Sequence, residues 1–447
     1  MPYWDWALGE KGGPVPDFFT TETITVKKTD GTEESIFNPL YAYSFHPLNP
    51  ADFDEKWSTI DKTIRWPTGD GLNATSQQDK FKESFIEQQG NIITEMGVVF
   101  RSSSFSKFAE RIEQPHGWIH GIVGGGWEQD LQFQGHFWPL EYSAFEPLFM
   151  LHHTNVDRLF TLYQAAHPNA TMAPFKVRTG NVFLEQGQDA DNSTLLLPFR
   201  KESGEFYTTK DIWNHTVLGY TYPETQPWNY TSDSEYGAAV NATIATLYTG
   251  SAREKVLVHQ SASSEQTMLL VQNASFTDWT IETQASALHM PSTFIVRFFL
   301  VGDFSSDASI DAGTWMILMP SDHDSHGRKS RVTRRPTSRR AKRVSTLDQT
   351  LKGTLSLTSH LIDQVAAGKL DSLDAKDVVP YLKERLTWKV SAGDGTTVPQ
   401  SSLDALTIEV FSTDALVPED PTSPIEYSDD TTAHPEITVG KRGGVAG

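Results

Sequence analysis

Apolar residues in the first half of the chain recur every three to four positions, the spacing that places them on one face of a helix. This period predicts helices over Gln77–Gly97, Phe105–Ile112, Pro147–Ala166 and Ser234–Tyr248. After Val256 the pattern changes to short runs rich in β-branched and aromatic residues, which are typical of strands. The expected strands are Val256–His259, Met268–Gln272, Trp279–Glu282, Phe294–Val301, Trp315–Met319, Thr354–Leu357, Leu386–Val390 and Thr407–Phe411.

This change of pattern predicts a multidomain protein with both α and β structure. Residues 1–222 form a mainly helical core, and residues 256–447 form an antiparallel β-sandwich or barrel with helical turns at Thr346–Leu351 and Ala375–Leu386. The polar stretch 223–255 between them is expected to be a linker. A length of 447 residues lets each of the two larger parts bury a core of its own.

The chain is acidic, with a formal net charge of -20, and this argues against nucleic-acid binding. One basic run, 328–343, breaks the trend: Arg328, Lys329, Arg331, Arg334, Arg335, Arg339, Arg340, Lys342 and Arg343. Such a run is usually a solvated surface loop. Its dibasic pairs also allow a second interpretation, a processing site for secretory proteases. No apolar run reaches the eighteen residues of a membrane span.

Four histidines lie in or beside two of the predicted helices. His116 and His120 are four residues apart, so on a helix they share one face, with Cβ atoms roughly 5–6 Å apart. His152 and His153 are adjacent and point about 100° apart, so we expect only one of them to reach the same ion. Imidazole binds copper, zinc, iron and nickel, so these residues predict a metal site without choosing the metal.

The segments 115–120 and 149–158 resemble the copper B half of type-3 copper proteins, the family of tyrosinases, catechol oxidases and haemocyanins. The opening segment 2–6 (Pro-Tyr-Trp-Asp-Trp) is similar to the one that follows the copper A helices in that family. Tyr220 and Tyr222 match the tyrosine motif that closes the catalytic core. The resemblance runs the whole length of the chain and points to the long fungal tyrosinases, which carry a C-terminal domain.

The resemblance implies roles for individual residues. His116, His120 and His153 would bind copper B, with His152 packing behind them and Phe149 beside the site. Asp157 would fix a helix or a neighbouring imidazole, or else pair with Arg158 or act as a cap. Glu113 matches the glutamate that holds a water near copper B, where it would help to deprotonate a phenol; the alternative is an ordinary acid of the first helical turn.

Three positions depart from the family pattern or have no role in it. Gly117 stands where monophenol-hydroxylating members often carry an asparagine, which favours catechol oxidation over phenol hydroxylation. Glu146 replaces the usual aspartate before Pro147, and the longer acid is expected to shift that cap. His136 has no role in the family pattern, and we expect it to be structural.

The implied function is oxidation by dioxygen of small phenols and catechols to quinones, which feed melanin, with two coppers in the intact family site. Only the copper B ligands occur here, because His46 is the sole histidine between Met1 and Pro115. We therefore expect an incomplete gene model or a divergent relative, inactive as it stands. Two alternatives stay open: an inactive protein with one mononuclear copper site, and an oxygen carrier like haemocyanin.

The resemblance also implies a latent enzyme whose C-terminal domain places an aromatic side chain over the site, with Phe294, Phe298, Phe299 and Phe304 as candidates. Seven of twelve asparagines lie in glycosylation sequons: Asn73, Asn169, Asn192, Asn214, Asn229, Asn241 and Asn273. This predicts a secreted glycoprotein if an N-terminal extension carries a signal peptide, and a cytoplasmic protein otherwise. There is no cysteine, so the chain forms no disulfide. The sequence does not predict the oligomeric state.

Overall fold

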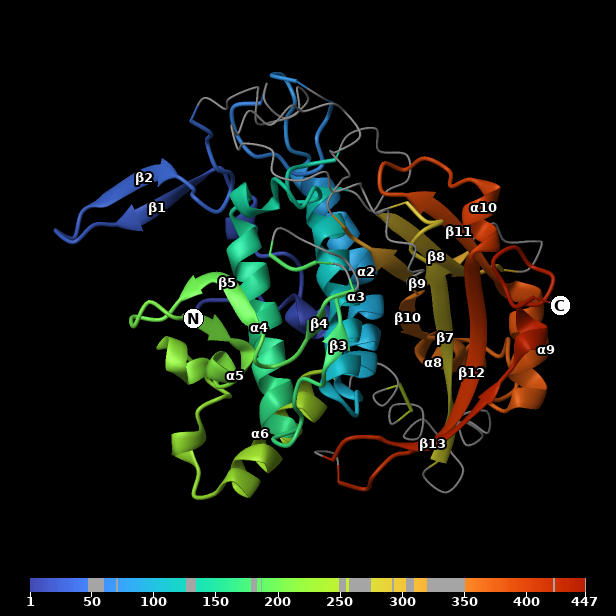
Figure 1. Ribbon diagram of the computed structural model, residues 1–447. Coiled ribbons are helices and arrows are strands. Elements are labelled where there is room, and N and C mark those ends of the chain that lie inside the picture. Colours follow the sequence, from blue (N-terminus) through green and yellow to red (C-terminus); the bar gives the residue numbers. More distant parts are fainter. Residues whose placement is uncertain are drawn as a thin grey trace, which may run out of the picture.

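The structure is a computed structural model. It describes residues 1–46, 60–69, 71–125, 134–177, 183–185, 187–248, 255–256, 275–291, 293–302, 309–319, 350–420 and 423–446. Figure 1 shows helices, coloured blue to green, on the side that carries the N-terminus, and the main strands, coloured yellow to red, on the side that carries the C-terminus. The protein thus combines a helical half and a β half.

Four long helices build the helical half: α2 (Gln78–Phe100), α3 (Phe105–Gly124), α4 (Leu148–Ala166) and α6 (Asp233–Leu247). The smaller elements are α5 (Thr209–Ile212) and the antiparallel pairs β1 (Thr23–Lys27) with β2 (Glu33–Phe37), β3 (Phe175–Lys176) with β4 (Asp189–Ala190), and β5 (Leu195–Arg200) with β6 (Phe206–Thr208). The apolar faces of the long helices share one buried cluster with the N-terminal Trp4 and Trp6.

Both ends of α3 are capped. The Ser104 hydroxyl caps the first turn by accepting a hydrogen bond from the backbone N–H of Lys107 at 3.3 Å. The helix stops at Gly125, whose φ of 83° is the left-handed conformation that glycine adopts without strain. The helix continues through Pro115, so His116 and His120 lie on consecutive turns of one face.

Two antiparallel sheets build the β half. One has the strand order β10 (Thr350–Ser356), β7 (Ser275–Ser286), β12 (Leu406–Leu416), β13 (Glu426–Ala433), and the other has the order β11 (Leu386–Ala392), β8 (Phe294–Leu300), β9 (Ile310–Ile317). The helices are α8 (Thr358–Ala366), α9 (Ala375–Arg385) and α10 (Gln400–Asp404). Both sheets and the first two helices contribute to a second buried apolar cluster.

Several sequence predictions need correction. The helix predicted within the expected linker forms as α6, but Val240, Ile244 and Tyr248 are buried in the helical core, so this stretch packs on the core rather than only connecting the two parts. Helix α3 runs twelve residues beyond its predicted end. Helix α8 and strand β13 were not predicted, and Thr350 and Leu351 belong to β10 rather than to a helical turn. The strand predicted at Met268–Gln272, most of that at Val256–His259 and the basic run 328–343 fall outside the described residues.

The two halves meet where α2 and α3 pack against β9 and β10. Ile295 and Met316 of the β half are buried in the core of the helical half. Polar contacts surround this apolar centre: the backbone N–H of Ser356 donates to Glu95 at 3.3 Å, His360 pairs with Asn91 at 3.0 Å, and Arg101 pairs with Asp278 at 2.5 Å.

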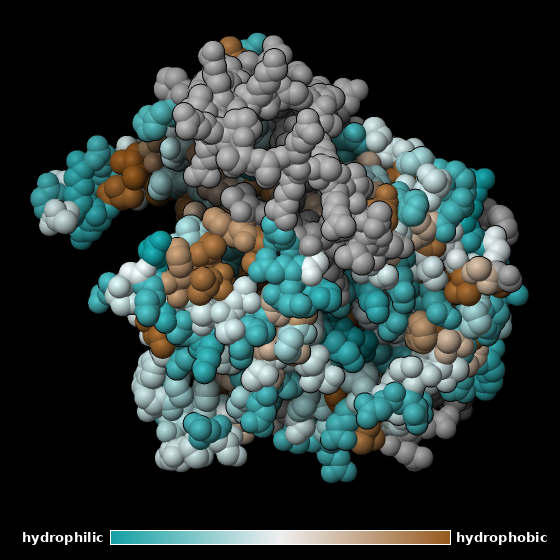
Figure 2. All heavy atoms as spheres, viewed as in Figure 1, coloured by the Kyte–Doolittle hydropathy of each residue, from teal (hydrophilic) through white to brown (hydrophobic). Residues whose placement is uncertain are grey.

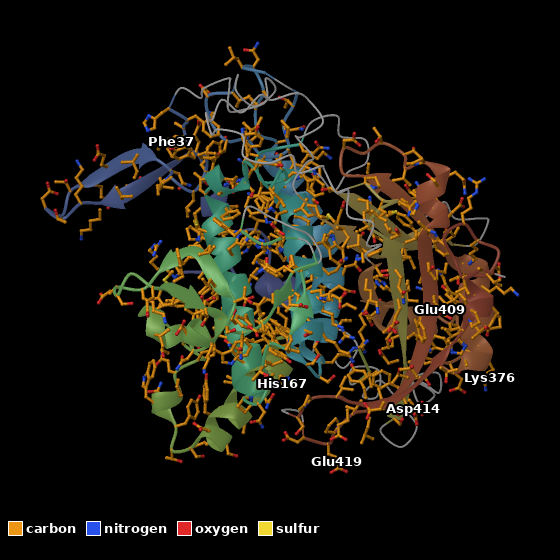
Figure 3. All side chains as sticks on the ribbon, viewed as in Figure 1. Phe37, His167, Lys376, Glu409, Asp414 and Glu419 are labelled. Carbon is orange, nitrogen blue, oxygen red and sulfur yellow. The ribbon has the colours of Figure 1, made fainter. Side chains whose placement is uncertain are left out.

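An interdomain cavity of about 520 Å³ lies beside these contacts. It is lined by residues of both halves, among them Arg101, Asp278, Tyr427 and His167. Figure 3 labels His167, the residue that follows the last turn of α4. The interface is therefore mixed, with polar groups from both sides buried beside apolar ones.

The visible surface in Figure 2 is mostly hydrophilic, with apolar residues in small separate groups. Scattered exposed apolar side chains of this kind are usual for a folded protein. Among the described residues, no helix is both long and apolar enough to cross a membrane.

Candidate metal centre

His116 and His120 on α3 meet His152 and His153 on α4 in one cluster. One ligand nitrogen from each lies within 4.8 Å of the corresponding nitrogen of every other. Within the described part of the chain, this is the one group of three or more potential metal ligands. The adjacency of α3 and α4 therefore assembles the predicted site from segments separated by more than thirty residues.

Three of the four imidazoles are oriented in the same way. His116 Nδ1 lies 2.9 Å from a Glu113 carboxylate oxygen, His120 Nδ1 lies 2.7 Å from the Phe137 carbonyl oxygen, and His153 Nδ1 lies 2.9 Å from the Phe149 carbonyl oxygen. An oxygen accepts from an N–H, so each Nδ1 carries the proton and each Nε2 keeps its lone pair. This is the pattern in which metal-binding histidines are held.

The Nε2 atoms converge. His116 Nε2 and His153 Nε2 are 3.1 Å apart, and His120 Nε2 is buried with no hydrogen-bond partner among the described residues. A buried nitrogen without a partner costs about 1–3 kcal/mol, a cost that a bound metal ion would remove. The donor set, three neutral imidazoles with carbonyl and carboxylate acceptors behind them, fits copper well.

Burial favours the neutral form of His120 and His153. Desolvation lowers the pKa of His153 to about 4 and holds the pKa of His120 well below its ordinary value. Metal ligation requires the unprotonated nitrogen, so these two imidazoles can bind metal at neutral pH without first losing a proton.

His152 and His153 both lie in the cluster, whereas we expected only one of them to reach the same ion. Their ring centres are 4.7 Å apart, and the ring of His152 also lies 5.2 Å from those of His116 and His120. The Cα–Cβ directions diverge along the helix, but the side chains are long enough for both rings to turn toward α3. His152 packs against Trp6 at 5.5 Å and has no exposed surface.

Two phenylalanine rings border the cluster. The ring of Phe149 lies 3.9 Å from that of His153, which matches the expected place beside the site. The ring of Phe137 lies 4.7 Å from that of His120. The backbone carbonyl of Phe137 accepts a hydrogen bond from the His120 Nδ1–H. The sequence did not indicate Phe137, because its contact with His120 is made by a backbone carbonyl, which every residue type has.

Asp157 helps to fix α4, one of the roles considered for it, through two tyrosine hydroxyls. Its carboxylate accepts hydrogen bonds from the hydroxyls of Tyr220 at 2.9 Å and Tyr222 at 2.5 Å. It thereby ties the tyrosine motif to α4, one turn beyond His153. Arg158 pairs instead with Asp5 at 3.0 Å and with Glu224 at 2.5 Å.

The start of α4 is fixed by a buried ion pair. Glu146 accepts a hydrogen bond from the Arg65 Nε at 2.7 Å and another from the backbone N–H of Leu148 at 2.8 Å. The longer acid therefore still caps the helix while reaching Arg65. His136 Nδ1 accepts a hydrogen bond from the Ile64 backbone at 3.1 Å, a structural contact as expected.

The three described candidates for an aromatic side chain over the site lie within the β half instead. Phe294 and Phe298 are buried in the core of the β half, Phe299 pairs with Asp311 and Thr387 within its sheet, and Phe304 lies outside the described residues. Met316 on β9 comes nearest, because a Cβ added at Gly117 would lie 3.4 Å from its methyl carbon. The predicted strand Trp315–Met319 includes Met316, but the search for an aromatic side chain over the site did not consider a methionine.

Comparison with known proteins identifies the fold and the family. Residues 1–166 match the common central domain of tyrosinase, and residues 278–410 match the tyrosinase C-terminal domain. The chain belongs to the tyrosinase family. These two domains also agree with the helical half and the β half seen here.

Individual relatives support the same assignment. A tyrosinase from Neurospora crassa is 26% identical over 98% of this chain and 77% of its own length, and one from Podospora anserina is 32% identical over 56% and 45% respectively. The solved structure of a recombinant mushroom tyrosinase superposes with a TM-score of 0.74 at 20% identity, over 97% of this chain and 76% of that one. The chain thus spans between about half and three quarters of the lengths of these relatives.

Proposed function

We propose that this tyrosinase-family protein is a copper oxidoreductase that oxidises phenols and catechols with dioxygen. The observation that carries the proposal is the shared orientation of three imidazoles, each holding its Nδ1 proton against an oxygen and presenting Nε2 to the others. The family match adds the choice of copper, which imidazole chemistry alone leaves open.

Copper, when bound, supplies the redox chemistry. His116, His120 and His153 would hold it, and the chain's other residues would fix the three rings and keep the site dry. Glu113 has a largely exposed side chain and already accepts from His116, so it orients this ligand; holding a water for phenol deprotonation remains a prediction.

The described residues offer one imidazole cluster, whereas the intact family site has two coppers. We therefore propose one copper at this cluster. A second candidate function, an inactive protein with one mononuclear site, gains support from the presence of His152 in the cluster.

We also propose that catechols are preferred over monophenols, because Gly117 has no amide to position a water beside His116. One hydrogen bond to such a water is worth about 0.5–1.5 kcal/mol, which is roughly a two- to thirteen-fold effect on rate. Gly117→Asn is expected to lower the ratio of catechol oxidation to tyrosine hydroxylation. An unchanged ratio of catechol oxidation to tyrosine hydroxylation would contradict this role.

The β half is proposed to limit access to the site, with β9 as the covering element. Met316 is 4% exposed and lies beside Gly117, next to the first ligand. Proteolytic release of this half would then expose the cluster. Glycosylation at the sequons and cleavage in the basic run also remain predictions.

The proposed function is tested first by metal content. Purified protein incubated with copper should retain one copper per chain, and His153→Ala should lose it. His167→Ala is the matched control, because His167 packs on Tyr163 away from the cluster. Retention of copper by His153→Ala, or two coppers per chain, would contradict the assignment.

A further inference from the structure

His152 has surroundings unlike those of the other three histidines. It is fully buried, and neither of its ring nitrogens has a hydrogen-bond partner among the described residues. Polar groups buried in this way are rare in folded proteins, because each costs about 1–3 kcal/mol. A ring that served only for packing would be better replaced by phenylalanine at this position.

The four ring centres form a nearly regular tetrahedron. Their six separations are 5.0, 5.2, 5.1, 5.2, 5.4 and 4.7 Å. Four imidazoles bound tetrahedrally to one ion, with metal–nitrogen bonds of about 2 Å, place their ring centres about 5 Å apart. The observed spacing therefore leaves room for one ion at the centre of all four rings.

We propose that His152 is a fourth ligand, so that this chain encloses a single divalent ion, zinc or copper, in a four-imidazole site. The inference rests on the proposed function for the identity of the other three ligands. Four protein ligands in tetrahedral arrangement are typical of structural metal sites. Metal bound in this way would stabilise the fold, because α3 and α4 would be joined through the ion.

The shape of the site supports this inference. His120 and His152 are completely buried, and Trp6 packs against the outer side of His152 at 5.5 Å. The side chain of His152 is thus confined between an indole and the other three rings. One of its nitrogens lies within 4.8 Å of a ligand nitrogen of each of the other three histidines.

The test compares zinc and copper binding by the full chain and by His152→Phe, with His167→Phe as the control. Phenylalanine fills the same space and has no lone pair, so the metal-free fold should be retained; circular dichroism and the melting temperature of the metal-free proteins check this. We expect His152→Phe to bind zinc at least about 100-fold more weakly, because loss of a ligand exceeds the 10–100-fold effect of removing an outer partner. X-ray absorption of the zinc-loaded full chain should show four imidazoles.

Two results would overturn the inference. One is equal zinc affinity in His152→Phe and the full chain, or three imidazoles in both, which would leave the copper assignment to His116, His120 and His153 intact. The other is absence of zinc and copper binding by the full chain, which would refute the proposed function as well. Should His152→Phe melt early without metal, His152→Asn provides the same comparison with a smaller polar side chain.

Discussion

A buried carboxyl group between the two halves is expected to make stability depend on pH. Glu95 on α2 is 3% exposed and accepts a hydrogen bond from the Ser356 backbone at 3.3 Å. Burial raises its pKa from 4.5 to about 8, against the opposing effects of this hydrogen bond and of Arg101 and Arg111. At neutral pH the folded protein therefore carries Glu95 as the neutral acid.

The sign of the effect follows from proton binding. Between pH 4.5 and about 8 the folded state holds one proton that the unfolded state has lost, so stability falls as pH rises. The free energy of unfolding falls by about 1.4 kcal/mol for each pH unit in this interval, and by about 5 kcal/mol over all of it. This value is an upper bound, because structural relaxation around Glu95 would reduce it. The contribution of Glu95 to the free energy of unfolding is fully present below pH 4.5 and is lost as the pH rises through about 8.

Glu95→Gln removes this proton while keeping an oxygen for the Ser356 N–H. Urea unfolding at pH 5, 6, 7 and 8 should show a variant that matches the parent at pH 5 and exceeds it by a few kcal/mol at pH 8. Glu87→Gln is the control, because Glu87 is exposed on the same helix. Parallel pH profiles for Glu95→Gln and the parent would refute this account of the interface.

Three further substitutions test other contacts. Gln114→Ala removes the donor to the Thr314 carbonyl and the acceptor for the Met316 N–H, and should lower the free energy of unfolding by about 1–3 kcal/mol in urea; no change would mean that α3 and β9 do not depend on this contact. Arg65→Met leaves Glu146 buried without its partner, so the free energy of unfolding should drop by about 3–5 kcal/mol. An unchanged melting temperature would contradict the pairing. Tyr222→Phe loses one hydrogen bond to Asp157 and should cost about 0.5–1.5 kcal/mol in the same urea assay, while a cost near zero would show that Tyr220 alone holds this carboxylate.

The sequence predicted the helices well because their signal is local. Periodic apolar residues in α2 and α4 and the paired histidines on α3 each depend on near neighbours in the chain. The three histidines proposed as copper ligands came from the family motif, and the structure places them in one cluster. Helices α2, α4 and α6 thus agree with the local pattern, whereas α3 extends twelve residues beyond it.

Predictions that depended on distant contacts were less successful. The acceptor for His120 is a backbone carbonyl from a loop, and the partners of Asp157 lie more than sixty residues away. The stretch around α6 was interpreted as a linker because its composition is polar and rich in sequons, but Val240, Ile244, Ala245 and Tyr248 are buried. The residue of the β half nearest to Gly117 is a methionine, which no aromatic pattern would reveal.

The central claim is that His116, His120 and His153 bind copper through Nε2. The most direct measurement is anomalous diffraction at the copper edge from crystals of the copper-loaded chain. The structure predicts one peak within about 2 Å of the three Nε2 atoms, at the centre of the cluster between α3 and α4. A peak elsewhere, or none at full copper loading, would contradict the assignment.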